Sequence, residues 1–208
     1  MLAIIDYQMG NLRSVQKTLE RVGVDATISS DAAVLTAADA LILPGVGAFR
    51  DAIDQLNRTG FADLIRRHVA EGKPLMGICL GLQLLFDVSE EDGEHKGLGL
   101  IAGRVVRFES QPGLKIPHMG WNTIAKSAAH ADAAELATIG DDDYVYFVHS
   151  YHVVPDDPSV IALTSDHGGP FVAAVKSGSI FATQFHPEKS QRVGQRLLEN
   201  FARTLATA

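Results

Sequence analysis

The sequence lacks the features that mark disulfide-stabilised, metal-stabilised or membrane-spanning proteins. It contains a single cysteine, Cys79, so no intrachain disulfide can form, and no Cys cluster or His-rich tract suggests a structural metal. No apolar run reaches the ~18–20 residues that a membrane span needs. The N-terminal segment lacks the basic start and the unbroken apolar stretch of a signal peptide. We therefore expect a cytoplasmic protein without a structural metal.

Basic residues are scarce relative to acidic ones. Lysine and arginine number 18, aspartate and glutamate number 25, and the formal net charge is −7. An acidic surface is a poor electrostatic match for nucleic acid or anionic lipid, so we expect neither as a partner. Apolar residues make up 46% and charged residues 21% of the 208 residues, which is typical of a globular protein. We expect a single domain spanning residues 1–208.

The N-terminal half alternates short apolar runs with amphipathic stretches. In the first such stretch, Val15, Leu19 and Val22 fall on one helix face. Strands are predicted at 2–5, 24–28, 40–43 and 74–78, and helices at 11–22, 49–56, 61–71 and 80–86. This alternation predicts an α/β fold whose parallel sheet is covered by helices on both faces.

The C-terminal half has a different pattern, with strand-like runs separated by turn signals. We expect these runs to add mixed or antiparallel strands to the same sheet, and a helix at 189–205 to close the chain. The polar segment 90–97 is predicted to be a mobile surface loop. The predicted strands are 99–108, 115–124, 144–149, 160–164, 171–175 and 180–184.

Cys79 lies at the most informative turn of the chain. A predicted strand ends in Gly77, Cys79 and Gly81 with one residue between each, and a helix follows. This is the cysteine form of the G-x-S-x-G nucleophile elbow, in which side chains at the flanking positions would collide. The turn lifts the sulfur above the sheet, and the helix N-terminus favours its thiolate. The alternative is a buried structural cysteine between packing glycines.

His186 is the histidine best placed to serve as a base. It follows an apolar strand, and Pro187 favours an extended backbone at His186, so Glu188 can lie beside the ring. A carboxylate that orients a histidine is the supporting half of a catalytic triad. The alternative is that Glu188 only caps the last helix. Four other histidines are predicted to be solvated surface residues: His68, His95, His130 and His167.

A glycine-rich loop follows the third predicted strand. Its glycines permit positive φ and expose backbone N–H groups, so Val46 and Gly47 could stabilise an oxyanion together with the N–H of Leu80. The loop lacks the Lys-Ser/Thr pair of a phosphate-binding loop. The alternative is an ordinary glycine-rich turn.

These motifs resemble those of the class I glutamine amidotransferases. Four further blocks are similar to the glutaminase subunits of imidazole glycerol phosphate synthases, and they lie in the expected order from the first strand to the last helix. They are DYQMGNLRS at 6–14, LPGVGAF at 43–49, PHMGWN at 117–122 and YFVHSY at 146–151. The resemblance implies a three-layer fold with a central, mostly parallel mixed sheet.

The resemblance also implies an activity and a set of residues. L-Glutamine would be hydrolysed to glutamate and ammonia by a triad of Cys79, His186 and Glu188, without a metal or organic cofactor. A (β/α)₈-barrel cyclase subunit would form a heterodimer with this chain and use the ammonia to make imidazole glycerol phosphate and an aminoimidazole carboxamide ribotide in histidine biosynthesis. The residues implied to contact glutamine are Gln83, His149, Ser150 and Tyr151, and those implied to face the partner are Trp121, Asn122, Tyr146 and Lys189.

Three other functions remain open from the sequence. The first is the glutaminase of another pathway, such as anthranilate, pyridoxal phosphate or purine synthesis, which the block 117–122 disfavours. The second is a non-catalytic binding subunit, which has no chemical reason to keep all three triad residues. The third is a cysteine protease or related hydrolase, which peptide turnover would reveal.

Overall fold

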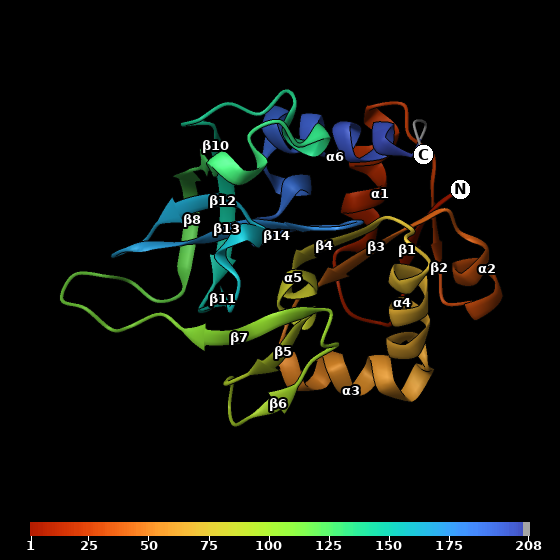
Figure 1. Ribbon diagram of the computed structural model, residues 1–208, viewed down its shortest axis with the longest axis horizontal. Helices are drawn as coiled ribbons and strands as arrows, with labels where there is room; N and C mark the ends of the chain where they lie inside the picture. Colours follow the sequence, from red (N-terminus) through yellow and green to blue (C-terminus); the bar gives the residue numbers. More distant parts are fainter. Residues whose placement is uncertain (206–208) are drawn as a thin grey trace.

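An eight-stranded sheet forms the middle of the molecule (Figure 1). The computed structural model describes residues 1–205. The strand order is β2-β1-β3-β4-β14-β13-β12-β9. The first five strands in that order are parallel, and they are β2 (Ala26–Ser29), β1 (Leu2–Ile5), β3 (Ala40–Gly45), β4 (Leu75–Cys79) and β14 (Ile180–Thr183). The antiparallel extension consists of β13 (Pro170–Ser177), β12 (Ile161–Asp166) and β9 (Ala125–Lys126).

Helices cover both faces of the sheet, because side chains along each central strand alternate between two apolar cores. In β1, Leu2 and Ile4 pack with buried residues of α1 (Leu12–Arg21) and α6 (Gln191–Thr204). Ala3 and Ile5 pack on the other side with the remaining helices. Those are α2 (Ala32–Ala37), α3 (Phe49–Thr59), α4 (Phe61–Ala70) and the short α5 (Leu80–Leu84). The predicted three-layer α/β fold is confirmed.

The expectation that all C-terminal strands join this sheet is wrong. Two smaller sheets lie beside it, one pairing β10 (Tyr144–His149) with β8 (His118–Thr123). The other has the order β11-β7-β5-β6. β7 alternates buried and exposed residues, as a sheet with one solvated face requires, whereas the central strands β3 and β4 are buried along their whole length. The bounds are β11 (Tyr151–Pro155), β7 (Ile101–Arg107), β5 (Phe86–Ser89) and β6 (His95–Lys96).

Several local predictions also need correction. Segment 90–97, predicted as a loop, contains β6, which pairs with β5. The last helix begins at Gln191, because the 3₁₀ turn Pro187–Lys189 precedes it. His68 is buried, not solvated, and its Nε2 lies 3.0 Å from the Pro74 carbonyl oxygen, on the core side of α4. Other 3₁₀ turns are Ala128–His130, Ala134–Leu136 and Pro158–Val160.

No helix within residues 1–205 combines the length and the apolar character that crossing a membrane would require.

Candidate active site

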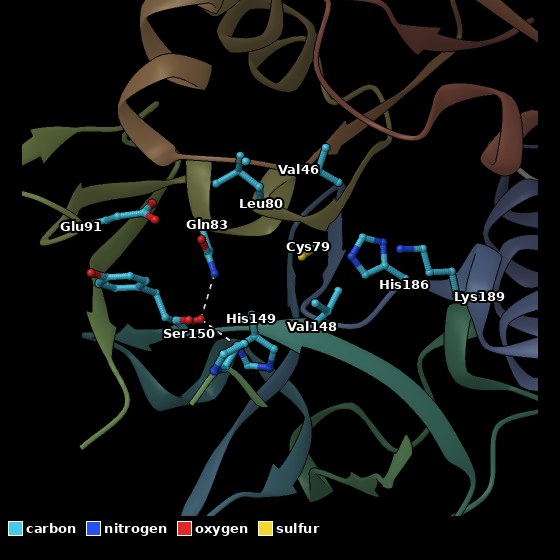
Figure 2. A pocket seen from close by; sticks show the side chains of 13 residues that line it. Val46, Cys79, Leu80, Gln83, Glu91, Val148, His149, Ser150, His186 and Lys189 are labelled. Carbon is cyan, nitrogen blue, oxygen red and sulfur yellow. Dashed lines mark hydrogen bonds between the residues drawn. The ribbon is translucent and has the colours of Figure 1, made fainter. Parts of the chain in front are cut away.

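Cys79 ends β4 and immediately precedes α5 (Figure 2). Its φ and ψ are 55° and −108°, a conformation that L-residues rarely adopt and that costs about 1–3 kcal/mol. The rest of the sheet must hold this strain, since Cys79 is paired with Gly45 of β3 at the same point. The side chain is only 6% exposed. A strained, nearly buried cysteine at a strand-to-helix turn is the arrangement that the elbow motif predicts.

The two glycines that flank Cys79 have the steric role that the sequence predicts. A Cβ on Gly81 would overlap the Leu43 carbonyl oxygen. A Cβ on Gly77 would lie 3.0 Å from the Ala182 Cβ and 3.0 Å from the Gly81 carbonyl. The contact at Gly81 involves a backbone oxygen of β3, so the elbow excludes a side chain there. At Gly77 a Cβ would require its neighbours to move by a few tenths of an ångström.

His186 lies beside Cys79, although the two residues are 107 positions apart in the sequence. Cys79 ends β4 and His186 closely follows the adjacent parallel strand β14, whose Thr183 pairs with Ile78 of β4. Both His186 and Glu188 are nearly buried, and His186 Nδ1 is 2.8 Å from Glu188 Oε1. Among residues 1–205, Nε2 of His186 has no conventional hydrogen-bond partner, and Figure 2 shows a ring nitrogen directed toward Cys79.

The environment of His186 favours its protonated form. Burial disfavours the imidazolium, but the Cys79 sulfur and the Glu188 carboxylate stabilise it and raise the pKa of His186 to about 10. Because this value exceeds the usual 6.5, the protonated ring stabilises the fold fully below pH 6.5. That contribution is lost as the pH rises through about 10.

Cys79 and His186 open into a cavity of about 460 Å³ (Figure 2). The cavity brings together the residues predicted for oxyanion stabilisation and those predicted for glutamine contact. Glu188 does not line it, because Glu188 lies behind the His186 ring. The predicted residues that line the cavity are Val46, Gly47, Cys79, Leu80, Gln83, His149, Ser150, Tyr151, His186 and Lys189.

Gln83 lies on α5 with its side chain directed by two acceptors. Its Nε2 donates to the Tyr151 carbonyl oxygen at 2.9 Å and to Gln184 Oε1 at 3.1 Å. Both amide hydrogens are thus committed, which leaves Oε1 as the atom available to a ligand. Gln184 Nε2 in turn lies 3.8 Å from the Cys79 sulfur. Gln184 is buried; it belongs to the stretch 184–188 that resembles the family, but the sequence assigns it no role in the site.

Comparisons with known proteins agree with this geometry. A sequence profile of the family described as glutamine amidotransferase class-I matches residues 3–205. The imidazole glycerol phosphate synthase subunit HisH of Syntrophotalea carbinolica is 56% identical over 206 residues, which cover 97% of this chain and 98% of that protein. The HisH subunit of Rhodopirellula baltica is 55% identical and covers 97% of both chains. The chain belongs to the HisH family of class-I glutamine amidotransferases.

Solved structures with low sequence identity support the fold. The structure of PurLQS from Thermotoga maritima matches with a TM-score of 0.75 at 20% identity, covering 98% of both chains. The glutaminase domain of the Trypanosoma brucei CTPS matches with a TM-score of 0.64 at 17% identity, covering 99% of this chain and 93% of that one. The HisH-family chain thus has the three-layer architecture of other glutamine amidotransferases.

Three of the four residues predicted to face a partner lie together near the mouth of the cavity. Trp121 is 46% exposed, and its ring centroid is 6.0 Å from that of Tyr146, its register partner across β8 and β10. Lys189 Nζ lies 5.8 Å from the Tyr146 ring centroid. Asn122 is not part of this group, because adjacent strand residues point to opposite faces. Its side chain instead bonds His118 and the Asp166 carbonyl oxygen.

Glu91 is a cavity residue of the HisH-family chain that the sequence analysis missed. It lies in segment 90–97, and its Oε2 accepts a hydrogen bond from the Phe49 backbone N–H at 2.8 Å. This bond ties the segment to the start of α3. No local pattern distinguishes Glu91 from its acidic neighbours, so the sequence carried no signal for it. Pro117 and Val148 also line the cavity, within blocks already noted.

Proposed function

We propose that this chain hydrolyses L-glutamine to glutamate and ammonia through a thioester on Cys79, and that it passes the ammonia to a (β/α)₈-barrel cyclase subunit. The observation that carries the proposal is the strained Cys79 elbow beside a buried His186–Glu188 pair. The cyclase would make imidazole glycerol phosphate, the product in the name of the relatives, together with an aminoimidazole carboxamide ribotide. Because Cys79 must stay reduced, we place the enzyme in the cytoplasm.

In the first half-reaction, the Cys79 thiolate attacks the side-chain amide carbon of glutamine while His186 holds the thiol proton. The backbone N–H groups of Leu80 and the Val46–Gly47 loop would hold the resulting oxyanion. His186 then gives its proton to the departing nitrogen, so that NH₃ leaves and a glutamyl thioester remains. Glu188 keeps the ring oriented and stabilises its positive charge.

In the second half-reaction, water attacks the thioester carbonyl. His186 takes one proton from the water through Nε2, and the second tetrahedral intermediate releases glutamate. The sulfur leaves as thiolate, which restores the starting ion pair. The new carboxylic acid releases its proton to solvent, so the sum is glutamine plus water giving glutamate, NH₃ and one proton.

The amino-acid end of glutamine requires groups that accept from an ammonium and donate to a carboxylate. Glu91 and the free Oε1 of Gln83 supply acceptors on the wall of the cavity. The backbone at Ser150 and Tyr151 lies on the same wall and can supply donors. We propose that these residues fix the substrate with its amide directed at Cys79.

Ammonia must leave the cavity without becoming protonated in bulk water. A partner docked over the cavity mouth would achieve this, and the exposed Trp121 with Tyr146 and Lys189 forms a suitable surface there. Aromatic residues are favoured anchors of protein interfaces. We propose that this surface contacts the cyclase.

The proposal is tested by mixing the chain with the cyclase subunit and measuring glutamate release with and without the ribotide substrate. We expect release to be low for the chain alone and to rise when both are added. Parallel mixtures with anthranilate, pyridoxal phosphate and purine synthases decide the pathway. Activation by one of these and not by the cyclase would contradict the proposal.

Replacing Glu188 by glutamine should lower the pKa of His186 from about 10, because the carboxylate that stabilises the imidazolium is lost. Glutaminase turnover should fall roughly 10²-fold or more, as expected for an impaired general acid–base. NMR titration of the ring and glutamate release measure the two effects. Glu20→Gln, an exposed change on α1, is the matched control. An unchanged pKa of His186 would argue against the pairing.

Replacing Lys189 by glutamate should weaken cyclase binding by roughly tenfold and leave folding intact, because the side chain is exposed at the proposed interface. Titration calorimetry and thermal unfolding measure these two effects. Lys17→Glu on α1 makes the same change in net charge at an exposed residue outside the group of Trp121, Tyr146 and Lys189. If the two variants bound the cyclase with equal affinity, Lys189 would not be part of the interface.

A further inference from the structure

A chain of hydrogen bonds between side chains connects β8 with the wall of the cavity. Asn122 Nδ2 lies 3.2 Å from His118 Nε2, and His118 Nδ1 lies 3.3 Å from His149 Nε2. His149 Nδ1 lies 2.8 Å from the Tyr151 carbonyl oxygen. That same oxygen accepts the hydrogen bond from Gln83. The chain therefore ends on a residue that lines the cavity.

The direction of each bond follows from the first residue. Asn122 Oδ1 accepts a hydrogen bond from the Thr123 backbone N–H at 2.9 Å, so Nδ2 must be the atom that faces His118. His118 Nε2 must then accept, and its proton lies on Nδ1, which donates to His149. By the same reasoning His149 carries its proton on Nδ1 and donates it to the Tyr151 carbonyl. Only this arrangement satisfies all the contacts.

Packing holds both rings in the neutral form that the arrangement needs. The two histidines face each other across the β8–β10 pair. The His118 ring is stacked against Phe147 at 4.8 Å and against His167 at 4.1 Å between centroids. Burial lowers the pKa of His118 to about 4, and it lowers that of His149 to about 3. Both rings are therefore uncharged at neutral pH.

Every polar group in a buried series of hydrogen bonds needs a partner, and the last group in this series is the Tyr151 carbonyl. A carbonyl oxygen accepts two hydrogen bonds, and this one takes one from His149 and one from Gln83. The His149 bond fixes the oxygen just after the end of β10. The oxygen then fixes the amide of Gln83, whose Oε1 is left for the ligand.

We propose that His118 and Asn122 are positioning residues for glutamine, which act through His149 and the Tyr151 carbonyl on Gln83 and do not touch the substrate. This proposal rests on the proposed function, because glutamine is taken as the ligand of the cavity. It also gives His149 a positioning role in place of the direct substrate contact that the family resemblance implies.

Kinetics of the complex with the cyclase test the role of His118. His118→Phe keeps an aromatic ring against Phe147 but cannot donate to His149, so the KM for glutamine should rise about tenfold while kcat stays within about twofold. His118→Asn places an amide donor near the Nδ1 position and should recover much of the KM. His167→Phe is the matched control, because it keeps the stacked ring and removes no member of the chain. An unchanged KM in His118→Phe, or an equal rise in His167→Phe, would overturn the proposal.

A second measurement needs neither the cyclase nor glutamine turnover. In the free chain, ¹⁵N chemical shifts should show the Nδ1–H tautomer for both His118 and His149. Asn122→Ala should release His118 from this tautomer and raise the KM in the complex, which covers the case in which His118→Phe fails to fold. An Nε2–H tautomer at either ring would overturn the proposal. If the wild-type complex released no glutamate, the proposed function would fail. The tautomers would still decide whether the hydrogen bonds from Asn122 through His118 and His149 are formed.

Discussion

Replacing Cys79 by alanine should abolish glutamine-dependent synthesis by the complex, while synthesis from added ammonia continues at nearly the wild-type rate. The sulfur is the only protein group in the mechanism that forms a covalent bond with the substrate, so its loss should lower glutamate release by about 10⁴-fold or more. A positive φ disfavours alanine and cysteine to the same extent, so the backbone of the elbow should keep its conformation in the variant. Product formation with glutamine and with ammonium salts measures both activities.

The ammonia-dependent reaction serves as the internal control of that experiment. It reports whether the complex still assembles and whether the cyclase still works. Loss of both activities together would contradict the division of labour between the subunits. Persistent glutamine-dependent synthesis would contradict the assignment of Cys79.

Replacing Gly81 by alanine should destabilise the fold by at least about 3 kcal/mol, although alanine in a helix is normally favoured by about 1 kcal/mol over glycine. The sign reverses because the new methyl group would overlap the Leu43 carbonyl oxygen, a backbone atom of β3. The strand would have to move away from the elbow, so glutaminase activity should be lost in any molecules that still fold. Chemical denaturation measures the free energy of unfolding.

Gly140→Ala provides the matched control for that prediction. Gly140 has ordinary backbone angles, and a Cβ there would come no closer than 3.7 Å to Asp143 Oδ2. We expect the free energy of unfolding of this variant to lie within about 0.5 kcal/mol of that of the wild type, as is usual for surface substitutions. A similar small effect for Gly81→Ala would show that the elbow is not sterically restricted.

The parts of the fold that local patterns determine could be predicted from the sequence. The strand at Leu2–Ile5 is an apolar run too short for a helix, and the buried face of α1 follows from the spacing of Val15 and Leu19. The separate β8–β10 sheet could not be predicted, because its strands look like those of the main sheet. Which neighbour a strand pairs with depends on contacts between distant parts of the chain, as in the pairing of β8 with β10.

The candidate site divides in the same way. Cys79 and His186 could be predicted, because glycine spacing and the His-Pro-Glu order each have a steric meaning within a few residues. Glu91 and Gln184 could not be, since their roles arise only when β4, β14 and segment 90–97 meet. The contact of His118 with His149 depends on the register of two strands 31 positions apart. No sequence pattern encodes that register.

The most direct measurement is the rate at which a diazo-ketone analogue of glutamine alkylates Cys79 in the complex, with and without His186. Alkylation joins the sulfur to the analogue, releases N₂ and needs a proton for the diazo carbon, and in the proposed mechanism His186 takes the thiol proton and supplies it. Mass spectrometry should therefore find the adduct on Cys79 in the wild type, and the rate should fall by roughly 10²-fold or more in His186→Gln. An adduct elsewhere, or equal rates in the two proteins, would contradict the account.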